Sequence, residues 1–107
     1  MKILLDECVT KRLKQDLKEY EVFTVTQMRW NGLKNGKLLT ECVNNDFDII
    51  LTIDKNLMFQ QNLDRYPITI AVLNSLTSKI EELVLFMQSF KAQIESFEKH
   101  KAYLIDK

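Results

Sequence analysis

Two short runs of aliphatic residues end in acidic side chains, and they constrain the fold more than any other feature of this chain. Residues 3–5 (Ile-Leu-Leu) lead into Asp6 and Glu7, and residues 49–53 (Ile-Ile-Leu-Thr-Ile) lead into Asp54. Continuous apolar runs of this length are typical of strands buried on both faces of a parallel sheet. The acids then lie at the carboxyl ends of their strands, the edge where ligands bind in open α/β sheets. Two such strands side by side would bring the three acids within reach of one divalent cation.

Length and charge favour a single domain over residues 1–107. The chain is long enough to bury a hydrophobic core without the help of disulfides or a structural metal. Its fractions of hydrophobic residues (46%) and charged residues (28%) are typical of an ordinary globular protein. Its 15 basic and 15 acidic residues cancel to a formal net charge of zero. That balance argues against binding nucleic acid through bulk charge, although a local basic rim around a site remains compatible with it.

The cysteines and the N-terminus predict a cytoplasmic protein without a membrane partner. Cys8 and Cys42 form no Cys-x-x-Cys pair, and we interpret both as buried thiols of a reducing compartment rather than as a disulfide. Asp6 and Glu7 interrupt the first apolar stretch, so no signal peptide is expected. No apolar run approaches the roughly 20 residues that span a bilayer.

The first part of the chain predicts a strand, a helix and a second strand. Residues 2–6 form the first strand, residues 9–18 the helix and residues 21–26 the second, β-branched strand. Apolar residues recur in the helix at four-residue spacing: Val9, Leu13 and Leu17. This order and spacing favour parallel strands with a right-handed crossover.

The remaining residues are expected to continue the alternation. A loop over 27–34 leads into a helix over 35–44, with Asn35 on its inward face, and a strand over 48–54 follows. The later elements are a helical turn around 57–61, a strand over 68–73, a helix over 78–99 and an edge strand over 102–105. Ser78 and Glu81 are expected to form a capping box. The whole pattern predicts an α/β domain with a mostly parallel central sheet of four to five strands.

The expected helix over 78–99 carries a narrow apolar stripe, which consists of Ile80, Leu83, Met87, Phe90, Ile94 and Phe97. One interpretation is a helix that packs along the sheet. The other is that its last turns contribute to a homodimer.

The acids suggest a site for Mg²⁺ or Mn²⁺. These cations prefer oxygen ligands and usually bind one or two carboxylates together with waters and substrate phosphate. Asp6 and Asp54 would supply the carboxylates, and Glu7 would join them if the chain turns at that residue. Asn35 and Asn56 could add an amide oxygen or hold a metal-bound water. Such a metal would activate water and stabilise charge on a phosphodiester oxygen.

Basic residues flank each acidic element and could hold a phosphate backbone over the metal. They are Lys11 and Arg12 after Asp6, Lys34 and Lys37 around Asn35, and Lys55 after Asp54. Simpler roles compete with this interpretation. Asp54 could be a turn or cap residue after its strand, and Asp6 could be the N-cap of the first helix.

Taken together, four segments resemble the small PIN-like domains of the bacterial toxin–antitoxin type, and among these the short subgroup of unassigned function. The segments are residues 2–9 (Lys-Ile-Leu-Leu-Asp-Glu-Cys-Val), residues 30–39 (Trp-x-Gly-Leu-Lys-Asn-Gly-x-Leu-Leu), residues 51–57 (Leu-Thr-x-Asp-x-Asn-Leu) and residues 60–63 (Gln-Gln-Asn-Leu). The resemblance covers nearly the whole chain. It implies a single three-layer domain, with helices on both faces of the sheet.

The same resemblance implies a metal-dependent endoribonuclease, the toxin of a toxin–antitoxin pair. Asp6 matches the first-strand aspartate of the family, Asp54 the aspartate of its Thr-x-Asp motif, and Glu7 the Asp-Glu pair of the short subgroup. Asn35 and Asn56 stand where typical members have acids. Because an amide offers only a neutral oxygen, we expect weaker metal binding, or a non-catalytic relative that binds RNA or a protein partner.

Three further features have open roles. Trp30 could stack on a base, or it could close its loop onto the core. The amide cluster at residues 60–62 could contact nucleotides or stabilise a loop. His100, the only histidine, stands at the end of the last expected helix, where a cation complements the helix dipole.

Overall fold

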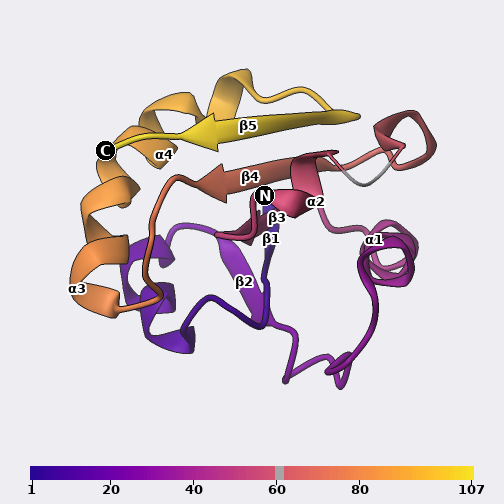
Figure 1. Ribbon diagram of the computed structural model, residues 1–107, viewed down its shortest axis with the longest axis horizontal. Coiled ribbons are helices and arrows are strands. Elements are labelled where there is room, and N and C mark those ends of the chain that lie inside the picture. The colour runs from indigo at the N-terminus through magenta and orange to yellow at the C-terminus, as the bar shows by residue number, and fades with distance from the viewer. Residues whose placement is uncertain (60–61) are drawn as a thin grey trace.

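Five short parallel strands form the centre of the molecule in a computed structural model that describes residues 1–59 and 62–107 (Figure 1). Their order is β2-β1-β3-β4-β5, and every neighbouring pair is parallel. Their bounds are β1 Lys2–Leu5, β2 Glu21–Thr24, β3 Ile49–Thr52, β4 Thr69–Leu73 and β5 Lys101–Ile105. The expected α/β fold with a mostly parallel sheet of four to five strands is confirmed: the sheet has five strands and is parallel throughout.

The central strands are buried on both faces, as their aliphatic runs predict. All residues of β3 and β4 are buried, and so are the last three residues of β1. One face carries the odd-numbered residues of β1, β3 and β4, and the other carries the even-numbered residues. Each face packs under its own layer of helices, so the domain has three layers.

Helices of both layers come from the connections between strands. The 3₁₀ helix η1 (Lys11–Leu17) packs on one face together with α3 (Ile80–Leu83), η3 (Val84–Phe86) and α4 (Met87–Gln93). The helix α1 (Asn35–Asn44) and the short α2 (Asn56–Phe59) pack on the other face. Figure 1 shows α1 and α3–α4 on opposite sides of the molecule. No helix in the described ranges is long and apolar enough to cross a membrane.

The first connection is a 3₁₀ helix, whereas the sequence predicts a longer helix over 9–18. Thr10 is its N-cap and accepts a hydrogen bond from the Arg12 backbone N–H, and Leu13 and Leu17 are buried as expected. A 3₁₀ helix rises about 2.0 Å per residue against 1.5 Å for an α-helix. The seven residues of η1 therefore span about the length of a four-residue strand, roughly 13 Å, with fewer residues than an α-helix would need.

The expected helix over 78–99 is divided into short segments. It begins with α3, passes through η3 into α4 and ends in the 3₁₀ turn η4 (Ile94–Ser96). The predicted capping box is wrong, because Lys79 occupies the N-cap position and makes no side-chain capping bond. Leu83, Met87 and Phe90 of the apolar stripe are buried against the sheet, which confirms the packing interpretation of that stripe.

The connection from β4 to β5 differs in hand from the other connections. The chain steps across the sheet in one direction from β2 to β3, from β3 to β4 and from β4 to β5. The connections from β2 to β3 and from β3 to β4 pack on the α1 face, whereas α3 and α4, which connect β4 to β5, pack on the η1 face. The last crossover therefore has the opposite hand, and it completes the cover of the η1 face.

Two expected local features lie partly or wholly beyond the described ranges. The helical turn predicted around 57–61 is observed as α2, which ends at Phe59. Residues 60 and 61, which also belong to the expected amide cluster, lie outside the described residues. Asn62 of that cluster caps the short η2 (Leu63–Arg65) through a bond from the Asp64 N–H. Its amide therefore has a local structural role.

Candidate functional site

The ends of β1 and β3 lie side by side and carry the predicted acids. Leu5 pairs with Leu51, and the Asp6 backbone N–H continues the ladder by donating to the Leu51 carbonyl at 3.0 Å. Asp54 follows two residues after the last residue of β3. Both acids are half-buried. The strand order 2-1-3-4-5 reverses direction between β1 and β3, and open α/β sheets bind ligands at this switch point.

Thr52, the last residue of β3, connects the two acidic residues. Its hydroxyl donates to Asp6 Oδ2 at 2.7 Å and accepts from the Asp54 backbone N–H at 3.0 Å. The side chain is completely buried. It therefore fixes one oxygen of Asp6 and the start of the turn that carries Asp54. Thr52 is not among the predicted site residues, although the Thr-x-Asp spacing is the signal that could have identified it.

Cys8 lies beside this connection. Its Sγ is 3.4 Å from Thr52 Oγ1 and 3.7 Å from Asp6 Oδ2. Burial, as the main cause, raises the pKa of the Cys8 thiol, while the Thr52 hydrogen bond acts in the opposite direction. Both cysteines are free thiols, as expected, but Cys8 is only half-buried and lines the site.

Glu7 turns away from the strand and is tied to the loop before α1. Its Oε1 accepts a hydrogen bond from the Gly32 backbone N–H at 2.6 Å. Gly32 has φ = 82°, a left-handed conformation that glycine adopts without steric cost. The bond joins the end of β1 to the loop that delivers Asn35, and it leaves Glu7 exposed at the rim.

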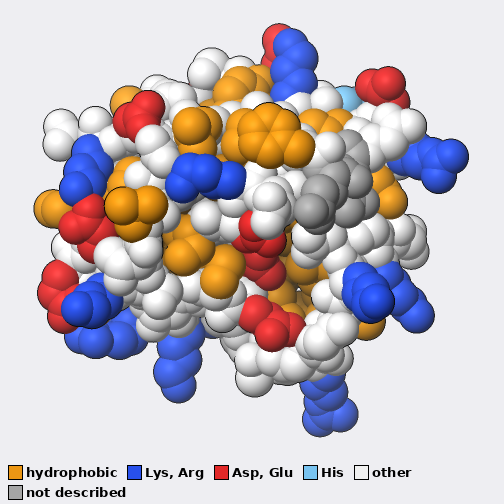
Figure 2. Space-filling model, viewed as in Figure 1, with side chains coloured by type: hydrophobic (Ala, Val, Ile, Leu, Met, Phe, Trp, Pro, Cys, Tyr) orange, Lys and Arg blue, Asp and Glu red, His pale blue; other side chains and the backbone are white. Residues whose placement is uncertain are grey.

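A pocket of about 380 Å³ brings the main candidates together. Asp6, Glu7, Asp54 and Asn35 all line it. Cys8, Gly32, Leu33 and Leu38 complete its wall. Figure 2 shows acidic side chains near the middle of one face of the molecule, with most Lys and Arg side chains around the outline.

Of the simpler roles expected for the two aspartates, the turn at Asp54 is observed and the helix cap at Asp6 is not. Asp54 does form a turn, because its Oδ1 accepts from the Asn56 N–H at 2.9 Å and its carbonyl from the Leu57 N–H. This arrangement holds the carboxylate at the pocket. Asp6 is not the N-cap of the first helix, since Thr10 has that position. Asn56 contributes its backbone and does not line the pocket.

The start of α1 points an uncapped helix end toward the same pocket. Lys34 is the N-cap residue and makes no side-chain capping bond. Within the described residues, the N–H groups of Asn35, Gly36 and Lys37 have no recorded acceptor. Helix N-termini of this kind favour anions such as phosphate.

The basic residues and Trp30 are more scattered than expected. Lys11 lines a second pocket, on the other side of β1, whereas Arg12, Lys34 and Lys55 line neither pocket.

Trp30 is half-buried and packs edge-on against Phe47 at 5.8 Å between ring centroids. Its contact supports the loop-closing interpretation. His100 has φ = 67°, and its ring nitrogen lies 3.0 Å from the Leu63 carbonyl oxygen, remote from the acids in the fold.

The donor set suits a cation that is held by few protein ligands. Asp54 Oδ2 and Glu7 Oε2 have no recorded partner in the described part of the chain, and Asp6 offers further lone pairs. In that same part, no three His, Cys, Asp or Glu side chains form a group that could hold a metal. Mg²⁺ commonly keeps several waters and takes one or two carboxylates plus substrate oxygens. The residues present therefore fit a two-carboxylate site and do not fit an all-protein cage.

Comparisons of the chain with protein-family models, with curated proteins and with solved structures found no match, so the function has to be argued from this geometry.

Proposed function

We propose that this chain is a metal-dependent endoribonuclease of the PIN-like type. The observation that carries the proposal is the convergence of Asp6 and Asp54 on one pocket at the β1/β3 switch point. The uncapped start of α1 beside these acids adds N–H donors for a phosphate. Carboxylates next to anion-binding N–H groups suit a phosphodiester held over a divalent cation.

The residues have distinct roles in this proposal. Asp6 and Asp54 would hold Mg²⁺ or Mn²⁺, which supplies an activated water and charge stabilisation at the phosphate when it is bound. Glu7, held by Gly32 at the rim, accepts a proton from the attacking water or orients it. Asn35 and the first turn of α1 hold the phosphate oxygens. Thr52 keeps Asp6 and Asp54 aligned through its two hydrogen bonds.

The test compares variants that change the charge but keep the shape of these side chains. Asp6→Asn and Asp54→Asn are expected to abolish cleavage of single-stranded RNA, while circular dichroism and the melting temperature stay close to native. Asn at position 54 keeps an oxygen that accepts from the Asn56 N–H, so the turn is retained. Asp64→Asn, which changes an exposed carboxylate on η2, is the matched control. Cleavage that survives both site substitutions contradicts the proposal.

A non-catalytic binding module on the same fold is the second candidate. It is favoured by the amides at positions 35 and 56 and by the lack of a three-ligand metal group within the described ranges. Such a module would bind RNA or a protein partner without cleaving it. RNA binding that persists in EDTA, combined with no cleavage at any Mg²⁺ or Mn²⁺ concentration, would favour this function over the first.

The proposed activity also implies partners. As a toxin, the protein would act in the cytoplasm and would be neutralised by an antitoxin, whose gene is expected beside its own. A homodimer is the other proposed assembly. The apolar stripe on which that proposal relied is largely buried within the molecule, with Leu85 left 53% exposed on the outer side of the same segment. Sedimentation at several concentrations would detect the dimer.

A further inference from the structure

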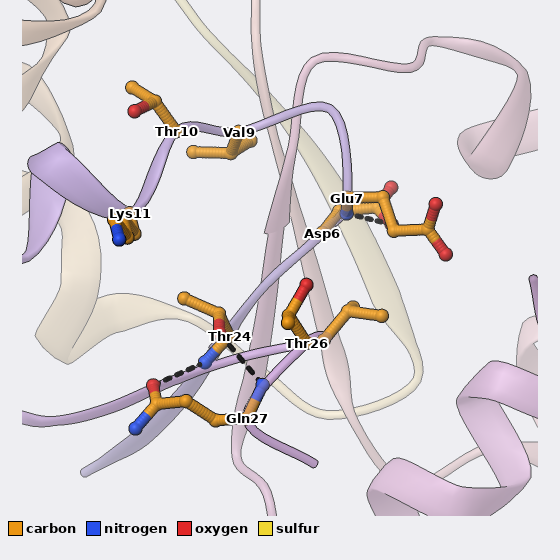
Figure 3. Close-up of a pocket in the computed structure, with 9 residues that line it drawn as sticks. Asp6, Glu7, Val9, Thr10, Lys11, Thr24, Thr26 and Gln27 are labelled. Carbon is orange, nitrogen blue, oxygen red and sulfur yellow. Dashed lines mark hydrogen bonds between the residues drawn. The ribbon is translucent and has the colours of Figure 1, made fainter. Parts of the chain in front are cut away.

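A second pocket, of about 430 Å³, adjoins the first on the opposite side of β1. Asp6 and Glu7 line both pockets. Because β1 lies between β2 and β3 in the sheet, the first pocket lies at the β1 and β3 ends and the second at the β1 and β2 ends. Figure 3 shows Thr24, Thr26 and Gln27 on one wall of the second pocket, facing the segment 9–11 on the other. The two pockets therefore lie on either side of Asp6 and Glu7, at the same edge of the sheet.

The second pocket offers hydroxyl groups that are available as donors. Three threonines line it, and the oxygen of each already accepts a hydrogen bond from this chain. The pairs are Arg12 N–H to Thr10 at 3.3 Å, Gln27 N–H to Thr24 at 3.1 Å and Asn31 Nδ2 to Thr26 at 3.0 Å. None of these hydroxyl hydrogens has a recorded acceptor in the described residues. A ligand of this pocket is thus expected to present acceptor atoms, such as carbonyl and sugar oxygens.

The remaining wall combines an apolar surface with a positive charge. Val9 and Val25 also line the pocket, and each belongs to the hydrophobic core on its own face of the sheet. Lys11 is exposed at its mouth and forms no ion pair within the described residues. Gln27 is held in place, because its Oε1 accepts from the Thr24 N–H and from Lys14. The wall is therefore ordered by its own hydrogen bonds before any ligand binds.

We propose that this second pocket binds the nucleoside adjacent to the phosphate at the Asp6–Asp54 site, with Lys11 on the following phosphate. The inference rests on the proposed function and adds a substrate requirement to it. The volume lies within the roughly 300–1,000 Å³ of small-molecule sites, and the hydroxyl donors match acceptors on a base or ribose. A base can enter such a pocket only when it is unpaired, so the ligand is single-stranded RNA of at least two nucleotides.

The test measures binding without catalysis. Fluorescent hexauridylate is titrated with the protein in EDTA at low salt, and anisotropy gives the Kd. Thr26→Val and Lys11→Gln are each expected to raise the Kd about fivefold, the effect of one lost hydrogen bond or phosphate contact. Thr26→Ser, which keeps the hydroxyl, is expected to restore native affinity. Lys18→Gln, the same charge change at an exposed residue that does not line the pocket, is the matched control.

The outcomes separate this inference from the proposed function. Native-like binding by Thr26→Val and Lys11→Gln, or no binding by the native protein, overturns the subsite. Equal weakening by Lys18→Gln also overturns it, since the effect would then be one of overall charge. Calorimetry with Mn²⁺ tests Asp6 and Asp54 independently. If the native protein binds hexauridylate but no Mn²⁺, the result contradicts the nuclease and leaves the pocket as a nucleotide site.

Discussion

At the scale of single residues, Thr52 determines how the two aspartates are presented. A carboxylate that accepts a buried hydroxyl donor has one oxygen fixed, so only the other lone pairs can turn toward a ligand. The Thr52 hydroxyl also accepts the backbone N–H of Asp54. Both bonds depend on one completely buried side chain, and replacing that side chain affects both acids at once.

Replacing Thr52 by Val is therefore expected to cost more than a surface substitution. Val keeps the volume but leaves the Asp54 N–H without a partner and Asp6 Oδ2 with only the weak Cys8 thiol donor, which destabilises the protein by about 1–3 kcal/mol. Thr52→Ser, which retains the hydroxyl, is expected to stay within about 1 kcal/mol of native. Urea unfolding measures both, and calorimetry with Mn²⁺ should show weaker binding for Thr52→Val only. Equal stability and equal Mn²⁺ affinity for the two variants would refute this role.

Cys42 gives a pH-dependent prediction. Burial, with a smaller effect of the charges of Asp6 and Glu41, raises the pKa of the Cys42 thiol from 9.0 to about 12. Above pH 9 the unfolded chain loses this proton and the folded protein keeps it. The free energy of unfolding is therefore expected to fall by about 1.4 kcal/mol per pH unit between pH 9 and the folded pKa.

The control for this effect is Cys42→Ala, which has no proton to lose. Denaturant unfolding at several pH values from 9 to 11 is expected to give a shallower decline for this variant than for the native protein. Other groups titrate in the same range in both proteins, so the difference between the two slopes reports Cys42. Identical slopes would show that the thiol titrates similarly in the folded and unfolded states.

The sequence predicts the acids but not their local bonding. An aliphatic run that ends in Asp can be recognised in the sequence, and parallel strands bring such ends to one edge of the sheet. The contacts of Glu7 with Gly32 and of Thr52 with Asp6 span 25 and 46 residues, so no local pattern reveals them. No sequence pattern predicts the second pocket either, because its two walls come from separate segments of the chain.

At the scale of elements, hydrophobic spacing predicts which side of a segment is buried better than which helix it forms. Leu13 and Leu17 are buried in η1, as are Leu83, Met87 and Phe90 in the last helical region. The four-residue step from Leu13 to Leu17 matches the 3.6-residue period of an α-helix, whereas a 3₁₀ helix repeats a face every 3.0 residues, so the spacing indicates the buried residues but predicts the wrong type of helix. The type is then decided by how far each connection must reach along the sheet.

The last helical region gives a prediction that separates packing from assembly. Phe90 is completely buried on the sheet, whereas Leu85 is 53% exposed on the outer side. Phe90→Ala is expected to lower the free energy of unfolding by about 3–5 kcal/mol, and Leu85→Ala by less than about 1 kcal/mol. Urea unfolding of both variants measures this. A large loss for Leu85→Ala that depends on protein concentration would instead indicate a dimer interface.

At the scale of the whole molecule, the strand order explains why one edge of the sheet carries both pockets. From β1 the chain runs to β2 on one side and then crosses over β1 to β3 on the other side. The loops after β1 and β3 therefore lead to opposite faces of the sheet. The gap between them is the switch point of a doubly wound sheet. Asp6 and Asp54 follow directly or closely after β1 and β3, whose residues are almost all buried, so the core fixes the points from which the two acids extend.

A cation bound at this edge would join β1 to β3 and stabilise the whole fold. A ligand that binds only the folded state at 100 times its Kd adds about 2.7 kcal/mol to the free energy of unfolding. For a domain of this size, that corresponds to a rise in Tm of roughly 10 °C. We expect Mn²⁺ to raise the Tm of the native protein and of Asp64→Asn, and to leave that of Asp54→Asn unchanged. Differential scanning calorimetry with and without EDTA measures the shift. An equal rise in Asp54→Asn would locate the cation elsewhere, and no rise in the native protein at saturating Mn²⁺ would refute a cation site formed by the two strand ends.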